Sequence, residues 1–182
     1  DVFRPEGSGH RPETRFRLQY DREGLYGLFS VRDRFVRCVA RKFQDPVCRD
    51  SCVEFFVRPA HGRGYVNFEF SAAGVLLAQH VADCRRRPGT DDVRPLTERE
   101  AAGIRIYHSL PGRIEQELAQ ETCYELGFFL PFSIFAGTHG APAPVSRTVW
   151  SGNVYKCGDD TSHPHWASWR PVRRVNFHEP DC

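Results

Sequence analysis

The sequence contains no methionine, only two lysines and no long apolar run. Without methionine, one of the common axial ligands of haem iron is missing. Nearly all basic residues are arginines and the net charge is only +2, which argues against a protein dedicated to binding nucleic acid or a membrane surface. No apolar stretch approaches the length that spans a bilayer. We therefore expect no nucleic-acid partner and no membrane span.

Several motifs with known chemistry are also missing. The sequence has no G-x-S-x-G elbow, no H-E-x-x-H, no P-loop and no dinucleotide fingerprint. Its seven cysteines follow neither a disulfide framework nor a C-x-x-C motif. We expect reduced, mostly buried thiols, which favours a reducing compartment. No signal peptide is visible, and because the chain opens at Asp1 without a methionine, a removed leader stays an open alternative.

The sequence is instead rich in short strand patterns. With 182 residues, of which 40% are hydrophobic, the chain has the composition of one globular domain, 1–182, with a sizeable core. Apolar residues that alternate or run continuously between turn residues predict about ten strands. The predicted strands are 16–20, 25–31, 35–40, 52–58, 65–71, 75–81, 104–109, 114–118, 122–130, 149–156 and 172–177.

Helix signals are few. The capping-box pattern Thr97-x-x-Glu100 predicts one helical turn, and the segment Pro131–Phe135 predicts a short helical cap over the sheet. Residues 83–96 are expected to form an irregular loop because three arginines precede Pro88 and Gly89. There is no long amphipathic helix and no internal repeat. The pattern predicts an all-β fold, an antiparallel β-sandwich with little helix.

The stretch 147–169 concentrates residues that stack, ligate metals or titrate near neutral pH. It holds all three tryptophans and two of the eight histidines. Cysteine and histidine suit zinc, and carboxylates suit harder ions, so the loop Cys157–His165 is a weak candidate metal site. The alternative is that these polar groups satisfy the loop's own backbone. The candidate ligands are Asp159, Asp160, His163 and His165.

Strand 52–58 raises a question about burial. Its residues Val53, Phe55 and Val57 share one face, whereas Glu54 lies on the other. If that face is buried, Glu54 needs a partner; the alternative is that it faces water. Glu54 and Glu69 together would provide the two carboxyl groups that a glycoside hydrolase uses. The sequence does not give the distance between these two groups. The residues alone indicate an all-β ligand-binding domain and do not support an enzyme.

Six segments, taken in order, resemble carbohydrate-binding domains of family 9. They are Arg49–Val57, Gly64–Phe70, Trp150–Asp159, Thr161–His165, Ser168–Trp169 and Asn176–Pro180. The resemblance covers most of the chain and implies a DOMON-like β-sandwich. It also implies a bacterial, non-catalytic module that binds a saccharide of the glucan or xylan type, in some members at the chain end. Such modules are often attached to xylanases and other glycoside hydrolases of polysaccharide breakdown, and they hold structural calcium.

The resemblance also implies site residues. Two tryptophans of that family sandwich a terminal sugar; here the first position falls near Val47, and the second falls at Phe177, which can stack. The acidic residue that bonds the sugar hydroxyls matches Glu54. Because the side chain of Val47 cannot stack on a sugar ring as an indole does, another tryptophan is a candidate for the first stacking position. The implied sugar-binding residues are Phe177, Glu54, Asn176, Tyr65, Asn67, Trp150 and Trp166.

Three alternatives to a sugar-binding module remain open. The first is an enzyme, either a glycoside hydrolase or a metal-dependent hydrolase that uses the Cys157–His165 loop. The second is a haem-binding relative, since some DOMON-like sandwiches hold haem. The third is an interaction domain that has lost its ligand, which Val47 at the expected tryptophan position favours. Fold alone does not decide between them.

Overall fold

The computed structural model describes residues 2–60, 64–139, 148–173 and 177–178. Its strands are β1 (Val2–Phe3), β2 (Glu13–Tyr20), β3 (Gly24–Asp33), β4 (Val36–Cys38), β5 (Cys52–Arg58), β6 (Tyr65–Ser71), β7 (Leu76–Val81), β8 (Val93–Pro95), β9 (Arg105–His108), β10 (Ile114–Leu118), β11 (Thr122–Pro131), β12 (Ser151–Gly158) and β13 (His165–Ser168). The helical segments are the 3-10 turn η1 (Val47–Arg49), α1 (Glu98–Ala101) and α2 (Ser133–His139).

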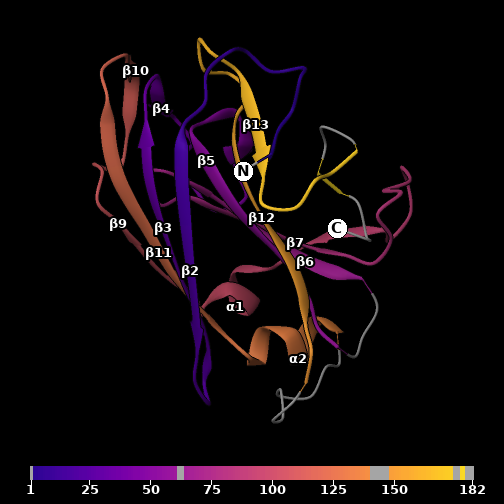
Figure 1. The fold of residues 1–182 in the computed structure, drawn as a ribbon. Helices are drawn as coiled ribbons and strands as arrows, with labels where there is room; N and C mark the ends of the chain where they lie inside the picture. Colours follow the sequence, from indigo (N-terminus) through magenta and orange to yellow (C-terminus); the bar gives the residue numbers. More distant parts are fainter. Residues whose placement is uncertain (1, 61–63, 140–147, 174–176, 179–182) are drawn as a thin grey trace.

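The strands form two large antiparallel sheets and one small one. The seven-stranded sheet has the order β1-β13-β12-β5-β6-β7-β8, the four-stranded sheet has the order β2-β3-β11-β9, and β10 pairs with β4. The two large sheets lie face to face, with α1 and α2 together at one end (Figure 1). The prediction of an antiparallel β-sandwich with little helix is confirmed. Among the described residues no helix is long and apolar enough to cross a bilayer.

The main core lies between the two large sheets. On β5 the apolar residues Val53, Phe55 and Val57 point inward, as strand alternation predicts. They meet phenylalanines of the four-stranded sheet, and the rings of Phe55 and Phe128 stack with centroids 5.6 Å apart. This apolar layer, at roughly 25 cal/mol per Å² of buried apolar surface, supplies most of the stability of the fold.

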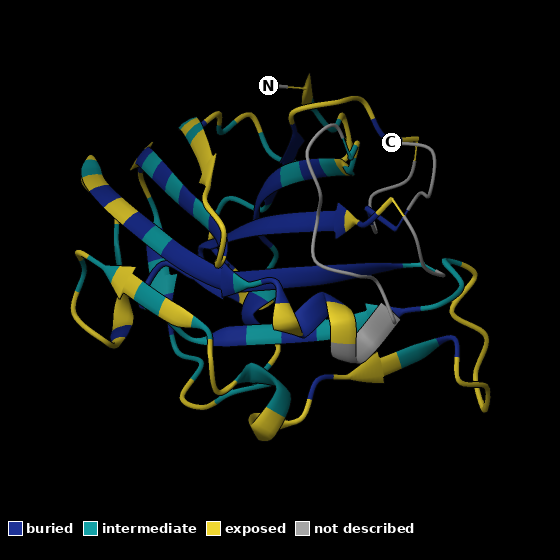
Figure 2. Ribbon diagram, turned by 90° about the horizontal axis from the view of Figure 1, so that it is seen from below, coloured by how far each residue is buried: buried dark blue, intermediate teal, exposed yellow. Residues whose placement is uncertain are grey.

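The central strands β5 and β6 are buried on both faces, which Figure 2 shows as nearly unbroken dark blue. A second apolar cluster covers the outer face of the seven-stranded sheet, the face that points away from the sandwich core. It contains Val47, Phe56, Tyr65, Tyr155 and Phe177. The outward side chains of β5 and β6 therefore lie beneath protein and not in water, and this layer positions the candidate site.

Most predicted elements are confirmed. Strands 52–58, 65–71 and 114–118 have the expected bounds, and Thr97 and Glu100 make both hydrogen bonds of the capping box. Two of the expected loops contain strands. Segment 83–96 contains the edge strand β8, which is too short to show a period, and β13 begins at His165 inside the expected loop. The described residues form thirteen strands where about ten were expected.

The predicted last strand, 172–177, does not form at the described positions. Residues 172, 173 and 177 are not in a strand, and residues 174–176 lie outside the described part. The physical reason is visible at Phe177, whose φ of 59° is in the left-handed region. A strand needs φ near −120°, so the chain turns at this residue instead of extending.

Candidate functional site

Three polar side chains lie together on the outer face of the seven-stranded sheet. Antiparallel pairing places Glu54 of β5 opposite Glu69 of β6, with Asn67 opposite the next outward residue of β5. All three are buried, and Glu54 is only 3% exposed. The Nδ2 of Asn67 donates to Glu69 Oε1 at 2.7 Å. We call Glu54, Asn67 and Glu69 the outer cluster.

Burial makes the two carboxyl groups weak acids. Burial, followed by the charge of Glu69, raises the pKa of Glu54 well above its ordinary value, although Cys157 Sγ donates a hydrogen bond to it at 3.2 Å. Burial also raises the pKa of Glu69 to about 7, against the opposing effect of the bond from Asn67. Two carboxyl groups on one buried face repel when both are ionised. Burial therefore favours the protonated form of Glu54, which can donate as well as accept.

The outer cluster has unused hydrogen-bonding capacity. The Oδ1 of Asn67 is completely buried and finds no donor among the residues that the structure describes. An unpaired buried carbonyl oxygen costs about 1–3 kcal/mol. Strongly perturbed carboxyl groups and an orphan amide oxygen in one place point to a ligand-binding role more than to a stabilising one.

Two residues of the C-terminal segment, Phe177 and His178, lie against the same face; we call them the cap. The ring of Phe177 stacks on Tyr155 with centroids 4.4 Å apart, and the Tyr155 hydroxyl donates to the Phe177 carbonyl oxygen at 3.3 Å. The Nδ1 of His178 lies 2.6 Å from the Tyr65 hydroxyl. Burial, with the charge of Arg86, lowers the pKa of His178 to about 3, so its ring is neutral. The cap is thus attached by one stacked ring and two hydrogen bonds.

The structure brings four of the seven predicted sugar-binding residues to this face: Phe177, Glu54, Tyr65 and Asn67. Trp166 packs at the edge of the same apolar cluster and donates from Nε1 to Asp159 Oδ1 at 2.7 Å. Trp150 lies elsewhere, on the side that faces the sandwich core, edge-on to Phe135 at 4.9 Å. Asn176 lies outside the described residues.

Val47, at the expected position of the first stacking tryptophan, is completely buried in the apolar cluster that also contains Phe177. It lies in η1, directly before β5. A buried valine offers no platform for a sugar, so Val47 does not supply the stacking surface expected at its position.

The four candidate metal ligands are engaged by other partners. Asp159 accepts from Trp166, and His163 stacks on Phe35 with centroids 3.6 Å apart. Asp160 lies 4.0 Å from Arg49, which places it in a loose surface ion pair. His165 uses both ring nitrogens, at 3.0 Å from the His163 carbonyl oxygen and at 2.8 Å from Lys156 Nζ. In the structure these four side chains contact protein groups, and a structural calcium ion stays a prediction from the resemblance.

The one group of potential metal ligands found in the described residues lies elsewhere. Atoms of Cys52, Glu54 and Cys157 fall within 4.8 Å of one another, and all three residues are buried. Burial raises the pKa of Cys52 to about 12, and the Cys52 bond together with burial raises that of Cys157. Both thiols are therefore protonated, and the group is a thiol–carboxyl hydrogen-bond network. The six described cysteines are all free, and Cys123 is the exposed one.

Sequence reasoning missed Glu69, Tyr155 and His178 as parts of this site. A signal for Glu69 existed: it sits two residues after Asn67 on the same strand face, opposite Glu54 once β5 and β6 pair in register. Tyr155 and His178 carried no such signal, because their positions depend on the packing of the C-terminal segment.

The pH dependence of stability tests the burial of Glu69. The pKa of Glu69 rises from 4.5 to about 7 on folding. The contribution of this group to the free energy of unfolding is therefore fully present below about pH 4.5 and is lost as the pH rises through 7. We expect the free energy of unfolding to fall by up to about 3 kcal/mol between pH 5 and pH 8 because of this group. Glu69→Gln, which keeps the acceptor for Asn67, should flatten this part of the profile in urea denaturation. Glu121→Gln, at an exposed position, is the control, and an unchanged slope in Glu69→Gln would show that the carboxyl is not perturbed.

Comparison with known proteins identifies the family. The model of carbohydrate-binding family 9 matches residues 1–182, and no curated protein matches significantly. A crystal structure of a Bacteroides uniformis protein that is proposed to bind carbohydrate shares 31% identity and a TM-score of 0.88, over 100% of this chain and 80% of that chain.

Two further structures are of a family 9 module from Caldicellulosiruptor kristjanssonii. The complex with glucose has a TM-score of 0.54 at 13% identity, over 87% of this chain and 66% of that chain. The complex with cellotriose has a TM-score of 0.54 at 12% identity, over 87% of this chain and 65% of that chain. At these identities the likeness concerns the fold alone. The match of the family model over the whole chain shows that the chain belongs to carbohydrate-binding family 9.

Proposed function

We propose that this domain binds saccharides without catalysis, and that the outer cluster together with the cap forms the binding site. The observation that carries the proposal is the buried outer cluster, in which Asn67 Oδ1 has no donor among the described residues and two carboxyl groups have raised pKa values. Sugar hydroxyls both donate and accept hydrogen bonds, so a saccharide can satisfy all three side chains.

The cap gives the proposed site its aromatic wall. Phe177 now stacks on Tyr155, and its left-handed backbone is strained for a residue with a side chain. We propose that Phe177 moves outward on binding and exchanges the Tyr155 ring for the apolar face of a sugar ring. Among the described residues, the movement breaks the contacts of Phe177 and His178 with Tyr155, Tyr65 and Phe56.

The proposed ligand is a glucan or xylan oligosaccharide bound at a chain end. Family membership supports this class, and family 9 modules of the same fold are known in complex with glucose and cellotriose. A site closed by a cap admits the end of a chain more readily than its middle, because a terminal sugar has one side free. The proposed biological role is to hold a polysaccharide for an associated glycoside hydrolase.

Calorimetric titration tests this function. We expect saturable binding of cello- or xylo-oligosaccharides, and loss of binding when the corresponding alditols replace them if the reducing end is recognised. Glu54→Gln should weaken binding about 2- to 10-fold, since it replaces the hydroxyl of a protonated carboxyl and a neutral hydrogen bond is worth about 0.5–1.5 kcal/mol. Glu121→Gln should bind as the wild type does. Absence of heat with every oligosaccharide, in folded protein, would contradict the proposal.

A further inference from the structure

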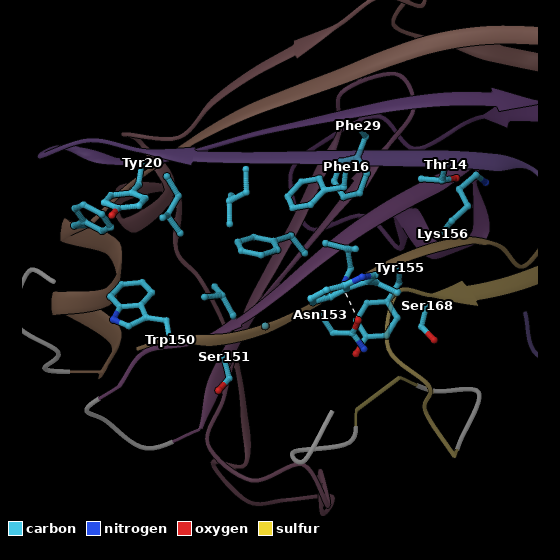
Figure 3. A pocket seen from close by; sticks show the side chains of 18 of the residues that line it. Thr14, Phe16, Tyr20, Phe29, Trp150, Ser151, Asn153, Tyr155, Lys156 and Ser168 are labelled. Atoms are coloured by element: carbon cyan, nitrogen blue, oxygen red, sulfur yellow. Dashed lines mark hydrogen bonds between the residues drawn. The ribbon is translucent and has the colours of Figure 1, made fainter. Parts of the chain in front are cut away.

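A cavity lies inside the sandwich, away from the outer cluster. It has a volume of about 1180 Å³ and opens between β2 of the four-stranded sheet and β12 and β13 of the seven-stranded sheet. Figure 3 shows it from close by, with Phe16 and Tyr20 of β2 on one wall and the backbone of β12 on the other. We call it the intersheet pocket. None of the outer cluster and cap residues lines it.

The body of the intersheet pocket is apolar and long. Alternate residues of β2, from Thr14 through Phe16 and Leu18 to Tyr20, all line it, which corresponds to a length of roughly 20 Å at 3.3 Å per residue. The deeper wall is built from core side chains such as Phe29 and Phe55. A ligand that fills this space must be elongated and mostly apolar.

The mouth of the intersheet pocket is unusually apolar for a protein surface. Three of the large hydrophobic residues that are exposed in the described part line it, with exposures of 47% for Leu18, 79% for Tyr20 and 55% for Trp169. Exposed apolar residues that gather around a cavity, in contrast to scattered ones, mark a binding site.

One polar atom at the inner end of the intersheet pocket has no partner. The hydroxyl of Thr14 on β2 is buried and makes no hydrogen bond to any residue that the structure describes. Figure 3 places Thr14 at the end opposite Tyr20 and Trp150. Buried hydroxyls are normally bonded, so the Thr14 hydroxyl is suited to a hydrogen-bonding group of a ligand.

The same end of the intersheet pocket offers no free charge. Lys156 also lines it, but its ammonium group contacts the Cys157 carbonyl oxygen at 3.0 Å, His165 Nε2 at 2.8 Å and Asp33 Oδ2 at 3.0 Å. The charge of Lys156 is therefore already paired with the Asp33 carboxylate. The end group of a ligand meets the neutral hydroxyl of Thr14 and no free cation among these residues.

We propose that the intersheet pocket binds an elongated, uncharged amphipathic small molecule. Its apolar body lies along Phe16 and Leu18, and its terminal hydroxyl or amide bonds the Thr14 hydroxyl. A long-chain alcohol has this chemistry. The site is separate from the proposed saccharide site, so either proposal can fail without the other.

Displacement of the neutral fluorescent probe 1-aminoanthracene by decan-1-ol tests this proposal. We expect saturable displacement by decan-1-ol, and at least about 10-fold weaker displacement by decanoate at pH 8, because a carboxylate would be buried without a partner. Thr14→Val, which removes the hydroxyl and keeps the shape of the side chain, should weaken decan-1-ol binding about 2- to 10-fold. Val154→Trp, which fills the pocket from β12, should abolish it while oligosaccharide binding stays unchanged.

Surface variants keep the test independent of core folding. Leu18→Asp places a charge in the mouth and should also abolish binding of decan-1-ol. Tyr107→Ser removes an exposed aromatic residue outside the pocket and should bind as the wild type does. The proposal is overturned if decan-1-ol gives no saturable displacement, if decanoate binds as tightly, or if Leu18→Asp retains wild-type affinity.

Discussion

Lys156→Met is expected to lower the free energy of unfolding by about 3–5 kcal/mol, because it leaves a buried carboxylate without its counter-charge. Lys156 is only 2% exposed, and its Nζ lies 3.0 Å from Oδ2 of Asp33, which is equally buried. The ion pair joins β12 of one large sheet to β3 of the other. Its loss therefore affects the packing of the whole sandwich.

The surroundings of this ion pair are polar and specific. Burial alone would raise the pKa of Asp33, but the charge of Lys156 and the hydrogen bond with His10 outweigh it and lower that pKa. His165 donates from Nδ1 to the His163 carbonyl oxygen, so its Nε2 must accept from Lys156. Burial and the nearby ammonium group lower the pKa of His165 to about 3, which keeps this acceptor neutral.

Urea denaturation followed by tryptophan fluorescence measures the effect. The chain has one other lysine, Lys42, which is exposed, so Lys42→Met is a matched control with an expected change within about 0.5 kcal/mol. The double variant Lys156→Met/Asp33→Leu should recover part of the loss, since it removes both charges. A single variant Lys156→Met as stable as the control would show that the ion pair is not buried as the structure has it.

Phe177→Ala is expected to weaken oligosaccharide binding by about 30-fold or more, the effect typical of a central aromatic residue in a binding site. In the proposed bound state the ring of Phe177 stacks on the sugar. Val47, at the position expected for the other stacking residue, is buried and cannot replace Phe177. Phe177→Trp, which keeps a flat aromatic side chain, should bind at least as tightly as the wild type in calorimetry.

Trp169→Ala is the control for this prediction. It removes an indole that is 55% exposed at the mouth of the intersheet pocket, and should leave oligosaccharide affinity within about 2-fold, as expected of a surface change outside the site. The reverse pattern, with affinity lost in Trp169→Ala and kept in Phe177→Ala, would place the saccharide in the intersheet pocket and contradict the account.

Local patterns were enough to predict the fold class. Alternation along Val53, Phe55 and Val57 and turn residues around the hairpins depend only on neighbours in the chain. Strands such as β8 have only three residues, too few to show an alternation of apolar and polar residues in the sequence. They are stabilised by pairing with a neighbouring strand. The turn at Phe177 is likewise a product of tertiary packing against Tyr155.

The candidate site was only partly predictable. Glu54 could be singled out because a carboxylate interrupts an apolar strand, but its burial depends on the cap, which is far away in the sequence. The pair Lys156 and Asp33 gave no signal, since neither residue belongs to a motif. The two aromatic residues Trp150 and Phe177 were both implied as sugar-binding residues, yet they lie on opposite faces of the seven-stranded sheet.

The most direct test of the central claim is a titration of ¹⁵N-labelled protein with cellotriose, followed by NMR. Saccharide binding at the outer cluster predicts that the side-chain amide of Asn67 and the backbone amides of Glu54, Glu69 and His178 shift with one shared affinity, while amides along β2 stay in place. Shifts confined to Leu18, Tyr20 and Trp169, or no shifts at saturating cellotriose, would contradict it.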